Sequence, residues 1–155
     1  MSIFKNFAAV CGLMTLSSAI GGFILPAQAG YTGNLEVQVG SLKNAKGQVC
    51  LSIFSGPKGF PSGGKGSNLK VSRCVPATNG SVTFTNLPLG TYAIAAIHDI
   101  KNEGKLTVNA LGIPTGGFGF SNNPPLRFGP ASFADSEILV SGTKTVVKIQ
   151  MRYLN

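Results

Sequence analysis

Charged side chains are scarce in this sequence, and acidic ones especially so. Only 12% of the 155 residues are charged, Asp and Glu together number 5, and there is a single histidine. Segments with helical periodicity are hard to find after residue 30, whereas Gly and Pro are plentiful, at 21 and 9. A chain with little charge, little helical pattern and many turn residues is predicted to be all-β.

No block of like charge is present either. The formal net charge is +8, but Lys and Arg occur singly from Lys43 to Arg152. A nucleic-acid interface clusters its cations and interleaves them with aromatic residues, so no nucleic-acid partner is expected. The dispersed charge allows a weak attraction to an acidic polysaccharide or to an envelope protein.

The first 29 residues have the pattern of a signal peptide. Lys5 precedes an uncharged apolar run from Phe7 to Leu25, and the small-x-small residues Ala27 to Ala29 follow. We expect cleavage before Gly30, which leaves residues 30–155 as one exported domain, periplasmic or extracellular, with no membrane span. The apolar run is nearly long enough to cross a bilayer, so an uncleaved anchor is the alternative.

Two cysteines remain after cleavage, Cys50 and Cys74. In an oxidising compartment an even pair predicts one disulfide, which would close a loop of about 25 residues and stabilise the fold by about 3–4 kcal/mol. Two buried reduced thiols on neighbouring strands are the alternative. A zinc site is not predicted, because two cysteines far from the only histidine do not complete a set of four ligands.

Strand-like patterns recur along residues 30–155. The first two of these segments are predicted to form a hairpin, and Thr91–His98, which is apolar on both faces, is predicted to be a central strand. About seven strands with regularly spaced turns predict a β-sandwich. The expected strands are Gly33–Leu42, Gln48–Ser55, Leu69–Pro76, Ser81–Thr85, Thr91–His98, Phe133–Val140 and Lys144–Leu154.

Two long connections have little strand pattern. Asp99–Ala131 is too apolar for a solvated tail, so we expect an ordered loop packed over one end of the sheet. The apolar side chains that indicate this are Ile113, Phe118, Phe120, Leu126 and Phe128. The loop Gly56–Asn68 matches the opening of a phosphate loop from Gly59 to Lys65. Gly66 stands where a magnesium-binding Ser or Thr is required, so this match is interpreted as a coincidence.

The run FTNLPLGTYAIAAIHD, at Phe84–Asp99, resembles the turn and strand of prealbumin-like sandwich domains. With GFGFSNN at Gly117–Asn123 and a set of residues between His98 and Pro114, the chain also resembles the DUF2141 family of exported bacterial proteins over essentially all of residues 30–155. This resemblance implies an Ig-like or prealbumin-like β-sandwich with one long loop, and a family of unknown function. The further residues that carry it are His98, Asp99, Asn102, Gly104, Leu106, Asn109, Gly112, Ile113 and Pro114.

The family's usual pattern after His-Asp is similar to a calcium loop without its flanking helices. Asp99 matches the first ligand and Gly104 the turn glycine, but Lys101 and Thr107 occupy ligand places. Calcium requires about six to eight oxygen ligands. No cofactor is therefore expected, and a calcium-stabilised module that uses Asp99 and Glu103 is an alternative.

A catalytic pair of His98 and Asp99 is the last alternative. Neighbours on a strand point to opposite faces, and no activated nucleophile is visible in the sequence. We therefore predict a non-enzymatic protein with a binding or structural role in the cell envelope, and the segment Asp99–Arg127 as its contact surface. The candidate functional residues are His98, Asp99, Asn102, Gly104, Asn109, Gly112, Pro114, Gly119, Phe120, Ser121, Asn122 and Asn123, the last three of which are expected to fold back on the main chain.

Overall fold

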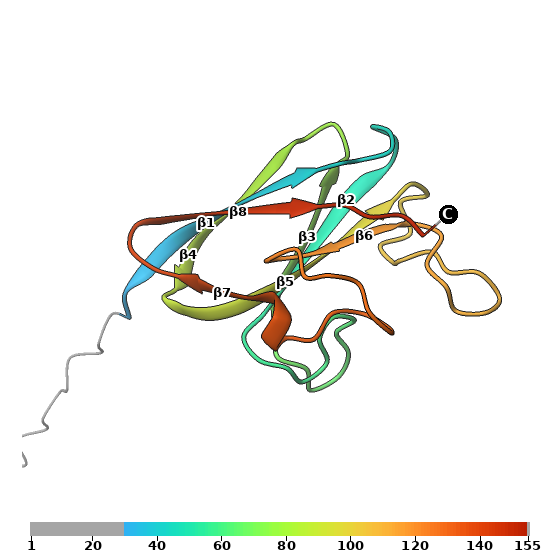
Figure 1. Cartoon of the computed structure of the whole chain (residues 1–155). Helices are drawn as coiled ribbons and strands as arrows, with labels where there is room; N and C mark the ends of the chain where they lie inside the picture. The colour runs from blue at the N-terminus through green and yellow to red at the C-terminus, as the bar shows by residue number, and fades with distance from the viewer. Residues whose placement is uncertain (1–29, 155) are drawn as a thin grey trace, which may run out of the picture.

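The computed structural model describes residues 30–154 and shows two β-sheets packed face to face (Figure 1). One sheet has three strands in the order β4 (Ser81–Pro88), β1 (Thr32–Gly40) and β8 (Lys144–Gln150). The other has the order β3 (Leu69–Pro76), β2 (Gln48–Phe54), β5 (Gly90–Asp99) and β6 (Gly117–Phe120), and β7 (Glu137–Val140) also pairs with β5. The all-β sandwich prediction is confirmed, with eight strands and one short 3-10 helix, Ala134–Ser136, in the described residues.

The main core lies between the two sheets. Leu35, Val37 and Val39 alternate along β1, and the matching residues of β2 are Val49, Leu51 and Ile53. Each of these side chains is buried, and burial of one aliphatic side chain stabilises a fold by about 1.5–3 kcal/mol.

The predicted hairpin of the first two strands is wrong. β1 pairs with β4 and β8, whereas β2 pairs with β3 and β5 in the other sheet. A hairpin would place both apolar stripes on one face of one sheet. The connection 41–47 instead crosses between the layers, so that the two stripes cover each other across the core.

β5 is the central strand, as predicted. One edge pairs with β2 along Ala93–Asp99, and the other edge is shared by β7, along Gly90–Ala93, and β6, along Ala95–His98. Its inner face contributes to the main core. A second cluster covers the outer face, where Phe60 from the connection 55–68 packs on Phe54, Phe120 and Phe133.

The segment Asp99–Ala131 is not a single loop, because it contains β6. Gly117 and Gly119 face the end of β8 and the chain that follows it. A Cβ atom on Gly117 would lie 2.6 Å from the Tyr153 ring, and one on Gly119 would lie 2.7 Å from Ile149. Phe118 exchanges two backbone hydrogen bonds with Arg152, of 3.0 and 2.8 Å. Only glycine permits this close approach, which is why the strand has only two apolar side chains.

The two last predicted strands are shorter than expected. Phe133–Val140 divides into the 3-10 helix and β7, and β8 ends at Gln150, before the Arg152 bridge to β6. β8 lies parallel to β1, from Asn34 opposite Lys144 to Gly40 opposite Gln150.

A tyrosine corner lies at the start of β5. The Tyr92 hydroxyl donates to the Pro88 carbonyl at 2.8 Å, an arrangement known from immunoglobulin-type sandwiches. The Ig-like or prealbumin-like classification itself stays a prediction. The predicted signal peptide, residues 1–29, and Asn155 lie outside the described residues.

Candidate functional site

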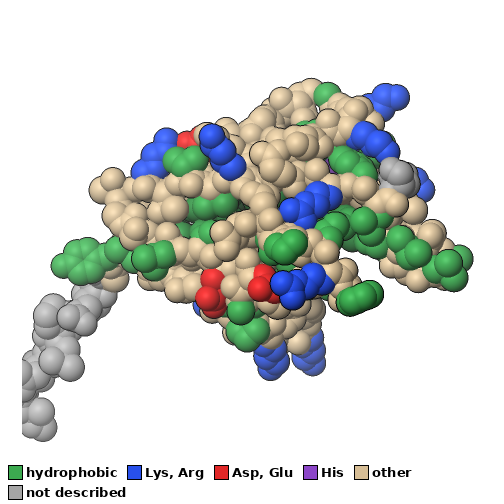
Figure 2. Space-filling view, viewed as in Figure 1, with side chains coloured by type: hydrophobic (Ala, Val, Ile, Leu, Met, Phe, Trp, Pro, Cys, Tyr) green, Lys and Arg blue, Asp and Glu red, His purple; other side chains and the backbone are tan. Residues whose placement is uncertain are grey.

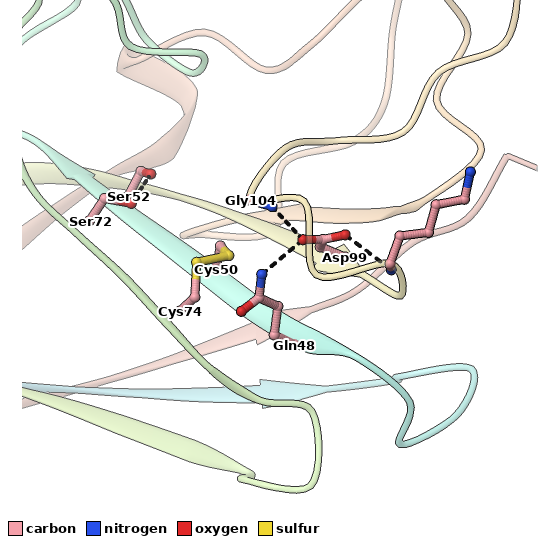
Figure 3. The surroundings of a disulfide bond; sticks show 8 residues. Gln48, Cys50, Ser52, Ser72, Cys74, Asp99 and Gly104 are labelled. Atoms are coloured by element: carbon pink, nitrogen blue, oxygen red, sulfur yellow. Dashed lines mark hydrogen bonds between the residues drawn. A yellow bond between two sulfur atoms is a disulfide. The ribbon is translucent and has the colours of Figure 1, made fainter.

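Cys50 and Cys74 form a disulfide, as the sequence predicts. They lie opposite each other on β2 and β3, on the outer face of the five-stranded sheet, with Cα atoms 3.9 Å apart. The neighbouring pair on the same face is Ser52 and Ser72, whose hydroxyl oxygens are 3.0 Å apart. Figure 3 shows both pairs on the side of the sheet from which Asp99 also points.

A groove of about 760 Å³ lies over this face. Its walls come from the segments 104–114 and 126–130, and Pro61 and Ser62 lie at its margin. Ligand pockets commonly have volumes of about 300–1,000 Å³ and mainly apolar walls. The floor consists of Cys50, Ser52, Ser72, Ala95, Ile97, Phe118 and Phe120, and the large apolar wall residues are Leu106, Val108, Ile113 and Leu126.

Lys105 and Arg127 are the charged residues among those that line the groove. Both are exposed, and the Lys105 ammonium lies 3.7 Å from the Glu103 carboxylate in a solvent-exposed pair. Such exposed pairs contribute little, so Lys105 is available to another anion. The lining residues include no Asp or Glu, so both charged side chains in the lining are cations.

Exposed apolar side chains surround the groove mouth. Leu111 is 82% exposed and Phe128 is fully exposed, and Val108, Ile113 and Leu126 are exposed as well. Figure 2 shows hydrophobic side chains gathered at the right of the molecule, over the yellow and orange loops of Figure 1. Contiguous apolar surface of this kind marks binding sites.

The segment 107–115 forms a hydrogen-bonded loop at the groove mouth. Val108 and Pro114 form a bridge, and the Thr115 amide donates to the Thr107 carbonyl at 2.9 Å. The Asn109 carboxamide accepts from the amides of Leu111 and Ile113 at 2.9 and 3.0 Å, and Gly112 has a φ of 76°. Asn109, Gly112 and Pro114 therefore shape the turn that presents Leu111 and Ile113 to solvent.

The Asp99 carboxylate stabilises the turn that lies at the start of the groove wall. Its buried carboxylate accepts from Gln48 Nε2 at 2.9 Å and from the amides of Gly104 and Lys101 at 2.6 and 3.2 Å. Burial alone would raise the pKa of Asp99, but these hydrogen bonds, together with one from the Glu103 amide, hold the pKa below its ordinary value.

These contacts do not suit a calcium ligand. The oxygens of Asp99 already face N–H donors, and Asn102 and Gly104 adopt the left-handed conformation at φ of 59° and 73° to bring the amides inward. Within residues 30–154, no group of three or more His, Cys, Asp or Glu side chains lies close enough to hold a metal ion. No cofactor is predicted, and calcium binding is the alternative that remains to be tested.

His98 lies on the opposite face of β5 from Asp99, buried at the end of the main core. Its Nε2 is 2.8 Å from the Lys46 carbonyl, which only accepts, so Nε2–H is the donor. Nδ1 then accepts from the Tyr153 hydroxyl at 2.7 Å, and that hydroxyl accepts from the Lys43 amide. His98 thus joins the turn after β1 to the C-terminal segment.

Ser121 and Asn123 complete the edges of two strands. Ser121 lies between β6 and β7, where its hydroxyl accepts from the Ile94 amide at 2.8 Å and donates to the Ser136 carbonyl. The Asn123 carboxamide donates to the Lys148 carbonyl and accepts from the Gln150 amide at 2.9 and 2.8 Å, along the edge of β8. Asn122 donates to the Asp135 carbonyl at 3.3 Å. These three side chains fold back on the main chain.

The structure thus divides the predicted functional residues into two groups. Gly104, Gly112, Pro114 and Phe120 line the groove. The others support the framework: His98, Asp99, Asn102, Asn109, Gly119, Ser121, Asn122 and Asn123.

Sequence reasoning did not identify Ser52 and Ser72, and it included Lys105 and Arg127 only as part of the contact segment Asp99–Arg127. Lys105 and Arg127 flank a segment rich in apolar residues. A single cation at each end of such a segment is the sequence pattern that could have identified them as site residues.

A second hollow, of about 610 Å³, lies between the edge strands β3 and β4. Arg73 ties the two edges together across it, because its guanidinium donates to the Thr83 carbonyl at 3.0 Å and lies 5.1 Å from the Phe84 ring centroid. The groove on the outer face is therefore the better candidate site.

The family model DUF2141, described as an uncharacterized protein conserved in bacteria, matches residues 37–148 and confirms the resemblance seen in the sequence. The matched range includes the disulfide, the Asp99 turn and both cations of the groove. No curated protein and no solved structure matches this chain. None of the helical residues within 30–154 forms a segment long and apolar enough to cross a membrane.

Proposed function

Because the chain belongs to DUF2141, a family of uncharacterized bacterial proteins, we propose its function from its own site: an exported binding protein of the cell envelope that holds an apolar ligand without transforming it. The groove on the outer face of the five-stranded sheet carries this proposal, because its volume, apolar walls and exposed apolar rim are those of a ligand site.

The contacts of His98 and Asp99 favour binding over catalysis. Both ring nitrogens of His98 have partners inside the fold, and the Asp99 carboxylate is engaged by amide donors. A general base must reach the proton that it removes. Neither group faces a substrate in this arrangement, so both act as structural residues in the proposed protein.

The disulfide supports export. Disulfides persist in oxidising compartments such as the periplasm and are rare in the bacterial cytosol. Together with the signal-like pattern of the first 29 residues, it favours a periplasmic or extracellular protein. The proposed partner is a ligand with apolar surface, in preference to an acidic polysaccharide, which would leave the apolar walls uncovered.

Binding of the neutral dye Nile red tests the groove directly, because its emission rises and shifts to shorter wavelength in apolar surroundings. We expect purified residues 30–155 to produce this change. Ser72→Trp places a large side chain on the exposed edge strand at the groove floor and should abolish it. Thr83→Trp, at an exposed strand position in the other sheet, is the matched control and should retain it.

Equal binding by wild type and Ser72→Trp would overturn the proposed site. Urea unfolding of both tryptophan variants establishes that each is folded before its binding is compared.

A further inference from the structure

We infer that the ligand of the groove is a monomeric amphiphile with one extended acyl chain and an anionic head group. This inference rests on the proposed function and adds the chemical class of the ligand. Two properties of the groove carry it: an apolar interior, and a rim on which the charged residues are exclusively cations.

The interior fits an acyl chain. Ile97 and Phe118 lie on the floor, and Leu106, Val108 and Ile113 form one wall. Each methylene group that such a surface removes from water strengthens binding by about fourfold, so affinity should rise with chain length until the groove is filled. A volume of about 760 Å³ lies within the range of sites that hold one small molecule.

The rim fits an anion. Lys105 and Arg127 belong to the two segments that form the walls, 104–114 and 126–130, so each wall segment supplies one cation to an anionic head group. Their long apolar stems extend the walls while the charges remain in water. Near Lys105 in sequence, the Asp99 carboxylate accepts from backbone amides, and the exposed Glu103 carboxylate forms only a weak pair with Lys105, which an anionic head group can replace.

Charge complementarity separates this class from its competitors. A neutral apolar molecule would gain nothing from the two cations, and an acidic polymer would gain nothing from the apolar walls. A carboxylate with an acyl tail uses both, and Arg in particular pairs with carboxylates through two parallel hydrogen bonds.

The test uses parinaric acid, a fluorescent polyene fatty acid, with residues 30–155 and competitors held below their critical micelle concentrations. Hexadecanoate and hexadecanol have equal chain lengths but differ in charge. We expect hexadecanoate to displace the probe at about tenfold lower concentration, and dodecanoate to displace it less well than hexadecanoate.

A double variant tests whether Lys105 and Arg127 cause the preference for a charged head group. Lys105→Ala with Arg127→Ala should reduce hexadecanoate to the level of hexadecanol and leave hexadecanol unchanged. Lys46→Ala with Lys148→Ala is the matched control, since it removes the same net charge at exposed positions outside the groove and should preserve the tenfold difference.

The outcomes separate this inference from the proposed function. The anionic head group is overturned if hexadecanoate and hexadecanol displace the probe equally, or if the Lys105 and Arg127 variant keeps the preference for hexadecanoate. In either case, Nile red binding would still support the groove as a ligand site. Flotation with phosphatidylglycerol vesicles, without binding of monomeric parinarate, would identify a membrane-docking surface and overturn it too. Full parinarate binding by Ser72→Trp would overturn both the inference and the site.

Discussion

At the scale of single residues, polar side chains take the place of missing strand neighbours. Ser121 fills the gap between β6 and β7 along β5, and Asn123 pairs with the free edge of β8. Buried backbone groups must have hydrogen-bond partners, so these residues are required wherever the ladder is interrupted.

Ser121→Ala should lower the free energy of unfolding by about 1–3 kcal/mol. The substitution removes the partner of both the Ile94 amide and the Ser136 carbonyl inside the protein. Equilibrium urea unfolding measures the change, with Ser81→Ala, at an exposed strand position, as the control. Equal losses in the two variants would show that the Ser121 hydroxyl is not a structural bridge.

Asp99 should make the fold sensitive to acid. Its folded pKa lies below the ordinary value of 3.8, so the stability that its carboxylate contributes is complete above that value and is lost as pH falls through the folded pKa. Asp99→Asn should therefore be less stable than wild type at neutral pH, and the difference should shrink at pH 3 and below. Melting temperatures of both proteins across this range measure it, and a constant difference would contradict the assignment.

The same carboxylate decides the calcium hypothesis. A calcium ion would have to displace the amide donors of Lys101 and Gly104 from Asp99. We therefore expect equal melting temperatures in millimolar calcium and in chelator, because a ligand that binds only the folded state raises the melting temperature. A rise of several degrees that disappears in Asp99→Ala would restore the calcium-stabilised module.

At the scale of secondary-structure elements, the strands with regular apolar alternation were predictable and their partners were not. β1, β2 and β5 are found close to their expected bounds. The alternation of apolar and polar residues indicates which face of a strand is apolar. It does not indicate whether two such strands lie in one sheet or in opposite sheets. β6 was missed because Gly117 and Gly119 alternate with its two phenylalanines, and the reason for those glycines lies in Tyr153 and Ile149, distant in sequence.

The disulfide between β2 and β3 leads to a prediction about how these two strands stabilise the fold. Cys50→Ser with Cys74→Ser should cost about 3–4 kcal/mol of stability, because the disulfide closes a loop across a sequence separation of 24 residues. Urea unfolding measures it, and wild type in reducing agent should show a comparable loss. A reduced protein as stable as the oxidised one would mean that the bond does not constrain the unfolded chain.

At the scale of the whole molecule, the groove is the feature that no single stretch of sequence reveals. Its surface combines β2, β3, β5 and β6 with two loop segments. The sequence did indicate Asp99–Arg127 as a contact surface, since its apolar residues exceed what a solvated loop carries. It did not indicate that Ser52 and Ser72 would form the floor, because small polar residues on a strand are ordinary.

The proposed export leads to a prediction about the mature protein as a whole. Expression of the full chain in a bacterial host should yield a periplasmic or secreted protein whose mass corresponds to a start at Gly30, with Cys50 and Cys74 oxidised. Mass spectrometry of the intact protein with and without reducing agent measures both. A full-length mass in the membrane fraction would indicate the uncleaved anchor instead.

The parallel pairing of β1 with β8 also determines when the fold can be completed. β1 is the first strand of the described chain to be synthesised and β8 the last, so the three-stranded sheet remains the pair β1 and β4 until almost all of the polypeptide is available. A two-stranded sheet is marginal in water, and contacts between distant segments form slowly. In a chain exported as we propose, this order of synthesis would delay completion of the fold, so that the chain would still be unfolded while it crosses the membrane.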